Sequence, residues 1–161
     1  MAASKAKKVV VEVNRSVPRC LGGLDESIHV SQVTMVVEGP NTPLVQLPEL
    51  KASDADRLIA KHVMALIEDG STIQLGIGAL PNIVGAMIAQ SDLKDIGVHT
   101  EMLADSYVDM YEAGRITGAR KAIDRGKMVY TFAMGSRKLY DFLDNNPAAA
   151  IYPVSYTNDP A

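Results

Sequence analysis

The sequence predicts an α/β fold in which a mainly parallel sheet is flanked by helices. Short β-branched runs alternate along the chain with segments whose apolar residues recur at helical spacing, an order typical of βαβ units. A turn with two glycines joins one of these runs to the next helix. The 161 residues, 47% hydrophobic and 22% charged, suit one domain with a sizeable core. We therefore expect a single α/β domain over residues 1–161, with residues 1–8 as a flexible or tag-like start.

The expected elements follow from local signals taken in chain order. Strands are expected at residues 9–13, 28–38, 72–75, 98–102, 128–132 and 149–152. Helices are expected from the N-cap Ser53 to Gly70, and at residues 82–90, 105–113 and 138–143. Proline-rich residues 39–48 predict a connector with little regular structure. No helix is expected after the last strand, an ending that suggests a fragment.

The turn after the strand at 72–75 is the first candidate binding feature. Gly76 and Gly78 carry no β-carbon, so a ligand can approach the backbone closely. The helix that follows directs N–H groups and its positive dipole end toward the turn, which favours an anion or a developing oxyanion. Pro81 replaces the third glycine of a dinucleotide fingerprint, so that motif is matched only in part. A simple tight strand-to-helix turn is the alternative.

Glu101 is the candidate catalytic residue. It ends the strand at 98–102, which we expect to lie parallel and next to the strand carrying the glycine turn. A carboxylate that faces backbone donors can attack an activated acyl group if the oxyanion is stabilised. A solvated glutamate at a strand end is the alternative. His99 would share a strand face with Glu101 and either orient it or pack.

Composition argues against several other functions. A net charge of −3 and an aromatic content of 5% give no reason to expect nucleic acid. No run approaches the roughly 20 apolar residues of a membrane span, and the single cysteine, Cys20, permits no intrachain disulfide. A cytoplasmic location fits these observations. No metal site is expected, because His62 lacks a second ligand nearby and the acids Asp105 and Asp109 suit a helix start.

Two stretches resemble the acetyl-CoA hydrolase/transferase family, most closely its butyryl-CoA:acetate and 4-hydroxybutyrate CoA-transferases. They are residues 69–81, DGSTIQLGIGALP, and residues 97–102, GVHTEM, and shorter matches cover nearly the whole chain. The resemblance implies a class I CoA-transferase-like fold, of which this chain is one half of a two-half fold, a fragment from the middle of the family chain. Two departures are Ser106, where relatives often have glycine, and two extra residues before Glu101.

The resemblance also implies a reaction and its residues. Glu101 would be the nucleophile, and the CoA-contacting loop would be Gln74, Leu75, Gly76, Ile77 and Gly78. CoA would pass from a short-chain acyl-CoA to a carboxylate such as acetate or butyrate through a glutamyl-CoA thioester, with acyl-CoA as substrate and no tightly bound cofactor. Expected partners are the acyl-CoA, the small carboxylate and the remaining halves of the same polypeptide, and the resemblance leaves a homo-oligomer open.

The resemblance leaves two other functions open. The first is an acyl-CoA hydrolase, in which water resolves the glutamyl-CoA thioester. The second is a non-catalytic nucleotide- or phosphate-binding module that uses only the glycine turn. Because the rest of the family chain is missing here, we expect the isolated chain to be inactive or nearly so.

Overall fold

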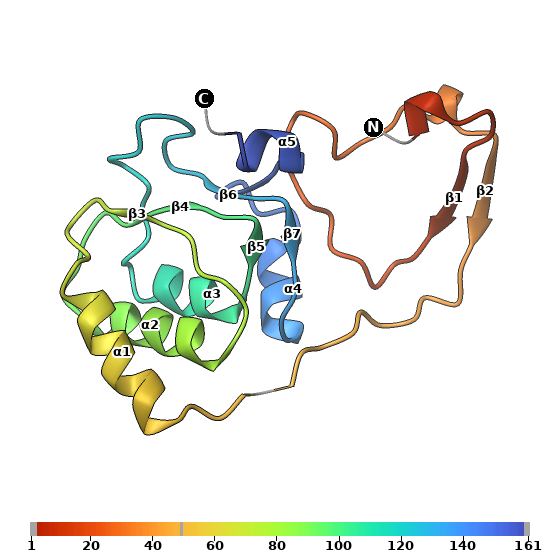
Figure 1. Ribbon diagram of the computed structural model, residues 1–161. Helices are drawn as coiled ribbons and strands as arrows, with labels where there is room; N and C mark the ends of the chain where they lie inside the picture. The colour runs from red at the N-terminus through yellow and green to blue at the C-terminus, as the bar shows by residue number, and fades with distance from the viewer. Residues whose placement is uncertain (1–2, 49, 160–161) are drawn as a thin grey trace.

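The computed structural model describes residues 3–48 and 50–159, and all strand pairings described in it are parallel (Figure 1). The main sheet has four strands in the order β3-β4-β6-β8. Their bounds are Thr72–Ile73, Gly97–His99, Met128–Tyr130 and Ala149–Ile151. The predicted α/β class, with a mainly parallel sheet flanked by helices, is confirmed.

Three helices lie side by side on one face of this sheet, and a fourth follows them (Figure 1). In chain order they are α1 (Asp54–Met64), α2 (Ala79–Gln90), α3 (Asp105–Glu112) and α4 (Arg137–Leu143). Ser53 caps α1 as predicted, and its hydroxyl accepts the N–H of Asp56. The helix ends at Met64, earlier than Gly70, so Leu66 lies in the loop beyond it.

The hydrophobic core fills the space between the sheet and these helices. Its largest fully buried side chains come from all the layers, and they include Ile88, Ile96, Val98, Leu103, Tyr107, Met110, Met128 and Leu139. Burial on this scale supplies the main favourable term in folding. The body formed by residues 53–159 therefore has a continuous core of its own.

Two of the predicted strands are interrupted at matching positions. The strand predicted at 98–102 divides into β4 and β5 (Met102–Leu103), and the strand predicted at 128–132 divides into β6 and β7 (Phe132–Ala133). β5 pairs with β7 in a separate two-stranded sheet. At the break, the Glu101 carbonyl accepts both the Thr131 and the Phe132 N–H, at 2.9 and 3.1 Å. The prediction of continuous strands was wrong because the chain bends at Glu101 and at Thr131, although the register is the same on both sides of the break.

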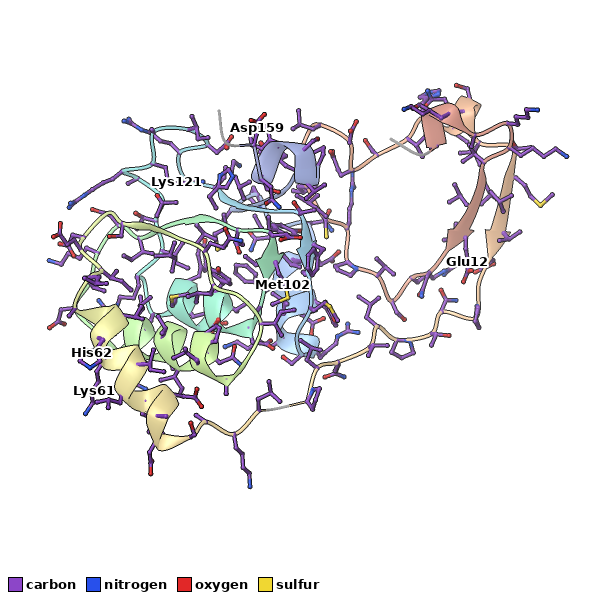
Figure 2. All side chains as sticks on the ribbon, in the orientation of Figure 1. Glu12, Lys61, His62, Met102, Lys121 and Asp159 are labelled. Atoms are coloured by element: carbon purple, nitrogen blue, oxygen red, sulfur yellow. The ribbon has the colours of Figure 1, made fainter. Side chains whose placement is uncertain are left out.

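The N-terminal part forms a parallel pair of strands that stands apart from the α/β body (Figure 1). β1 (Val10–Val13) pairs with β2 (Met35–Glu38) along its whole length. The strand predicted at 28–38 is shorter because η2 (Val30–Gln32) is a helical turn, which the His29 side chain caps. Side chains along the pair, including Glu12, project with no described element packed over them (Figure 2).

Both ends of the chain make contacts that the sequence did not predict. The segment before η2 follows the outer edge of β8, where Ile151 N–H donates to the Leu21 carbonyl at 2.8 Å. A short helix, α5 (Val154–Thr157), follows β8, so the expectation of no closing helix was wrong. η1 (Ala3–Lys5) lies within the predicted flexible start, of which residues 1–2 fall outside the described residues. No described helix has the length and apolar composition that crossing a membrane requires.

A pair of leucine truncations tests the position of the core. Leu139 is 0% exposed and Leu66 is 82% exposed, so replacing each with alanine removes the same atoms from opposite environments. We expect Leu139→Ala to lower the free energy of unfolding by about 2–5 kcal/mol, because it leaves a cavity. Leu66→Ala should change it by less than about 0.5 kcal/mol. Urea denaturation followed by circular dichroism measures both, and equal losses would contradict the assigned core.

Candidate active site

Loops that follow three parallel strands meet around one cavity of about 500 Å³. They are the glycine turn after β3, the segment after β5 and the turn between β7 and α4. Their contributions to the wall include Gly76, Ile77, Gly78, Ala104, Gly135 and Ser136. Because the carboxyl ends of parallel strands share one edge of a sheet, ligand sites of α/β proteins are usually found there.

The glycine turn presents unpaired backbone donors. Gly78 has a φ of 136°, which L-residues rarely adopt, so glycine is required there. Gly76 has no positive φ, and a β-carbon on it would meet no atom within 4 Å. In the described part of the chain, no acceptor bonds the N–H groups of Gly76, Ile77 or Gly78, and no side chain caps α2. The turn therefore keeps donors free at the positive end of a helix.

Glu101 lies at the break between β4 and β5. β3 and β4 are parallel neighbours, as predicted, so Glu101 and the glycine turn follow adjacent strands at the same edge. The residue is half-buried, and among residues 3–48 and 50–159 its carboxylate has no hydrogen-bond or ion-pair partner. The next residue, Met102, lines the cavity from β5 (Figure 2), whereas Glu101 itself does not.

His99 packs against the end of the chain. Its Nε2 lies 3.0 Å from the Thr157 carbonyl oxygen, and its ring stacks on Tyr156 with centroids 6.2 Å apart. Of the two roles left open by the sequence, packing is the one that these contacts support.

Sequence reasoning missed two side chains that connect the loops of the site. The Asp105 carboxylate accepts the N–H and the hydroxyl of Ser136, at 2.8 and 2.6 Å, which ties the start of α3 to the turn before α4. Tyr107 on α3 accepts the Leu75 N–H through its hydroxyl oxygen at 2.6 Å. Aspartate at a helix start and tyrosine in an apolar face are common, so neither pattern indicated a role in the site.

The connector forms one wall of the cavity. Leu47, Pro48 and Leu50 line it. The connector is held against α4 by the Leu47 N–H, which donates to Gly135 at 3.2 Å, and by the Tyr140 hydroxyl, which donates to the Val45 carbonyl at 2.7 Å. The sequence predicted only a loop here, because these contacts join residues about 90 positions apart.

Asp109, which lines the cavity, is paired with a lysine. Lys138 Nζ lies 2.7 Å from Asp109 and 2.6 Å from Glu112, and its hydrogen bond to Asp109 is the main cause that raises the pKa of Lys138 to about 12.

Ser106 is buried against Gly85, so that α2 and α3 pack closely. Among the described residues, no group of three or more histidine, cysteine, aspartate or glutamate side chains is arranged to hold a metal.

Comparison with known proteins identifies relatives of the whole chain. Residues 1–48 match the acetyl-CoA hydrolase/transferase N-terminal domain. A butyryl-CoA:acetate CoA-transferase of Anaerostipes caccae is 54% identical over 96% of this chain and 35% of its own length. The solved 4-hydroxybutyrate CoA-transferase of Porphyromonas gingivalis matches with a TM-score of 0.89 and 40% identity, over 99% of this chain and 39% of that one.

More distant relatives differ in their named activity. An acetyl-CoA hydrolase of Yarrowia lipolytica is 26% identical over 71% of this chain and 28% of its own length. The chain spans about 35% of the length of the first curated relatives that it matches. Sequence identity and fold agree with the resemblance noted from the sequence. The chain belongs to the acetyl-CoA hydrolase/transferase family.

Proposed function

We propose that this segment carries the catalytic glutamate and the CoA-contacting loop of an acyl-CoA:carboxylate CoA-transferase of the acetate/butyrate type. One observation carries the proposal: the Glu101 carboxylate has no partner among the described residues, and it follows the strand next to the one that ends in the free donors at residues 76–78. The names of the relatives support the same reaction class. A cytoplasmic location, where acyl-CoA is at hand, is part of the proposal.

The proposed reaction proceeds by two exchanges on Glu101. Its carboxylate attacks the thioester carbonyl, CoA leaves as the thiolate, and an acyl-glutamyl anhydride forms. The thiolate then attacks the glutamyl carbonyl, which releases the first carboxylate and leaves a glutamyl-CoA thioester. A second carboxylate attacks that thioester, and the returning thiolate takes the new acyl group and frees Glu101. Each step exchanges one acyl bond for another, so no net proton transfer is required.

The glycine turn would stabilise the oxyanion of each tetrahedral intermediate. Backbone donors that are already oriented cost no reorganisation when charge develops, and this makes them effective in catalysis. Gly76, Ile77 and Gly78 have such N–H groups free. Leu75 differs from them, because its N–H is already bonded to Tyr107 and its side chain packs against the core, so we assign Leu75 to the support of the CoA-contacting loop and not to the donors. Gln74 is exposed next to this loop.

An acyl-CoA hydrolase is the second candidate, because a distant relative is a named acetyl-CoA hydrolase. The same residues would form the glutamyl-CoA thioester, and water would then resolve it. Rates of thioester loss with and without acetate separate the two activities, since only the transferase depends on the acceptor carboxylate.

We also propose that the site is completed by other parts of a longer polypeptide. A two-stranded pair is marginally stable alone, and parallel sheets are normally covered on both faces. Val10 and Met35 on the β1–β2 pair are nevertheless 60% and 55% exposed. The relatives' greater length supports a covering segment from the same polypeptide, and assembly of two copies is compatible with it. The isolated chain would then lack part of its pocket.

Glu101→Gln tests the nucleophile. In the full-length protein, acyl-CoA should leave a CoA adduct on the peptide that contains Glu101, detected by mass spectrometry or by borohydride trapping. We expect Glu101→Gln to form no adduct and to lose turnover by about 10³-fold or more, because the nucleophile is gone. The control Glu112→Gln changes an exposed, ion-paired glutamate and should keep both. An adduct on another residue, or turnover without any adduct, would rule out the proposed role of Glu101. A full-length protein with neither turnover nor adduct would favour a binding module.

Gly76→Ala tests the approach of substrate to the glycine turn. A β-carbon at Gly76 meets no protein atom, so stability should change by less than about 0.5 kcal/mol. The methyl group would still occupy the space beside the donors, and we expect kcat/KM to fall by roughly tenfold or more. Gly78→Ala is the comparison, since its positive φ should cost stability as well. Normal kinetics in Gly76→Ala would argue against this loop as the contact with substrate.

Comparison of the isolated chain with the full-length protein tests whether another part of the polypeptide covers the β1–β2 pair. In the isolated chain, amide exchange at residues 10–13 and 35–38 should be fast relative to β4 and β6, and thioester exchange should be absent or nearly so. In the full-length protein these amides should be protected and thioester exchange should take place, because the strand pair is then covered and the pocket is complete. Equal protection in the two proteins, or turnover by the isolated chain that is lost on Glu101→Ala, would contradict this proposal.

A further inference from the structure

One fully buried hydroxyl joins the two loops of the proposed site. Tyr107 on α3 is 0% exposed, and its hydroxyl oxygen accepts the Leu75 N–H at 2.6 Å. Leu75 is the residue before the glycine turn. A buried polar group without a partner is costly, so this bond holds both Tyr107 and the backbone at the start of the turn.

The same hydroxyl also reaches the loop that carries Glu101. The Thr100 side chain faces it, and burial is the main cause that raises the pKa of Tyr107. Thr100 is itself 0% exposed, and its hydroxyl donates to the Met102 carbonyl at 2.9 Å. The Thr100 side chain therefore holds the residues on both sides of Glu101 together, and it lies beside the hydroxyl that is bonded to Leu75.

The ladder between β3 and β4 ends before either loop begins. Its last pair is Ile73 with Val98, two residues before Leu75 and two before Thr100. Beyond that pair, the Tyr107 hydroxyl is bonded to the Leu75 backbone and faces the Thr100 side chain. Catalysis by a carboxylate and separate donors is sensitive to their spacing, since a displacement of about 1 Å can cost roughly 100-fold in rate.

We propose that Tyr107 is a positioning residue, which sets the spacing between the donors at residues 76–78 and the Glu101 carboxylate through its bond to Leu75 and its contact with the Thr100 side chain. The inference rests on the proposed function, because it assigns Tyr107 to a reaction carried out by those groups. Tyr107 itself does not line the cavity.

The chain offers a matched control in Tyr130. This tyrosine on β6 is 1% exposed, and its hydroxyl lies near only the weakly bonding thiol of Cys20, without hydrogen-bond geometry to any described residue. Tyr107→Phe and Tyr130→Phe therefore remove the same atom from equally buried rings, and only the first removes a hydrogen bond to the backbone. Thr100→Val and Thr100→Ser form a second pair. Valine removes the hydroxyl that lies beside the Tyr107 hydroxyl, and serine keeps it.

The experiment measures turnover, KM and the single-turnover rate of adduct formation in the full-length protein. We expect Tyr107→Phe to lower kcat and the rate of adduct formation together by roughly 10- to 100-fold, with a smaller change in KM. Tyr130→Phe should leave all three unchanged. Thr100→Val should reproduce the loss and add little to it in the double variant, because both changes remove the same contact, and Thr100→Ser should restore activity.

Two results would overturn the inference. The first is that Tyr107→Phe has the same turnover, KM and rate of adduct formation as Tyr130→Phe. The second is that the fold-losses of Tyr107→Phe and Thr100→Val multiply in the double variant. The Thr100 pair gives the answer if Tyr107→Phe does not fold. Glu101→Gln in the same assay separates this failure from that of the proposed function. If Glu101→Gln abolishes the adduct while Tyr107→Phe is normal, only the positioning role is lost. If Glu101→Gln keeps the adduct, the proposed function itself fails.

Discussion

Parallel pairing of β3, β4 and β6 is the constraint on which the rest of the structure depends. Every strand of a parallel sheet ends at the same edge, so the loops that follow them gather there whatever their sequence. The helices that return the chain cover one face and bury the core. The ladder between β3 and β4 ends at Ile73 and Val98, before the loops begin, and beyond it Tyr107 from α3 is bonded to Leu75.

The break in the strands at Glu101 shows how a backbone can be held while its side chain stays free. The Glu101 carbonyl accepts two N–H groups from the neighbouring strand, and the Thr100 hydroxyl is bonded to the carbonyl of Met102. Main-chain polar groups at the break are thereby paired, as buried groups must be. The carboxylate takes no part in these bonds. Such an arrangement suits a residue that must react, because no ion pair has to be broken first.

The first 48 residues depend on the α/β body in spite of their separate strand pair. Residues next to Leu21 follow the edge of β8, which protects an otherwise unpaired strand edge. The connector is bonded to α4 through Val45 and Leu47, and its apolar side chains form one wall of the cavity. The part that matches the N-terminal domain of the family and the part that carries Glu101 therefore share the candidate site.

Local signals in the sequence determined the fold class, the cap at Ser53 and the glycine turn, because each depends on residues close together in the chain. The sequence also indicated the family, through the order of its motifs. Only the tertiary structure decided that two strands break at Glu101, that Tyr107 and Asp105 connect the loops, and that the connector walls the cavity. These contacts join residues 30 to 95 positions apart, and their geometry depends on packing that no local pattern encodes.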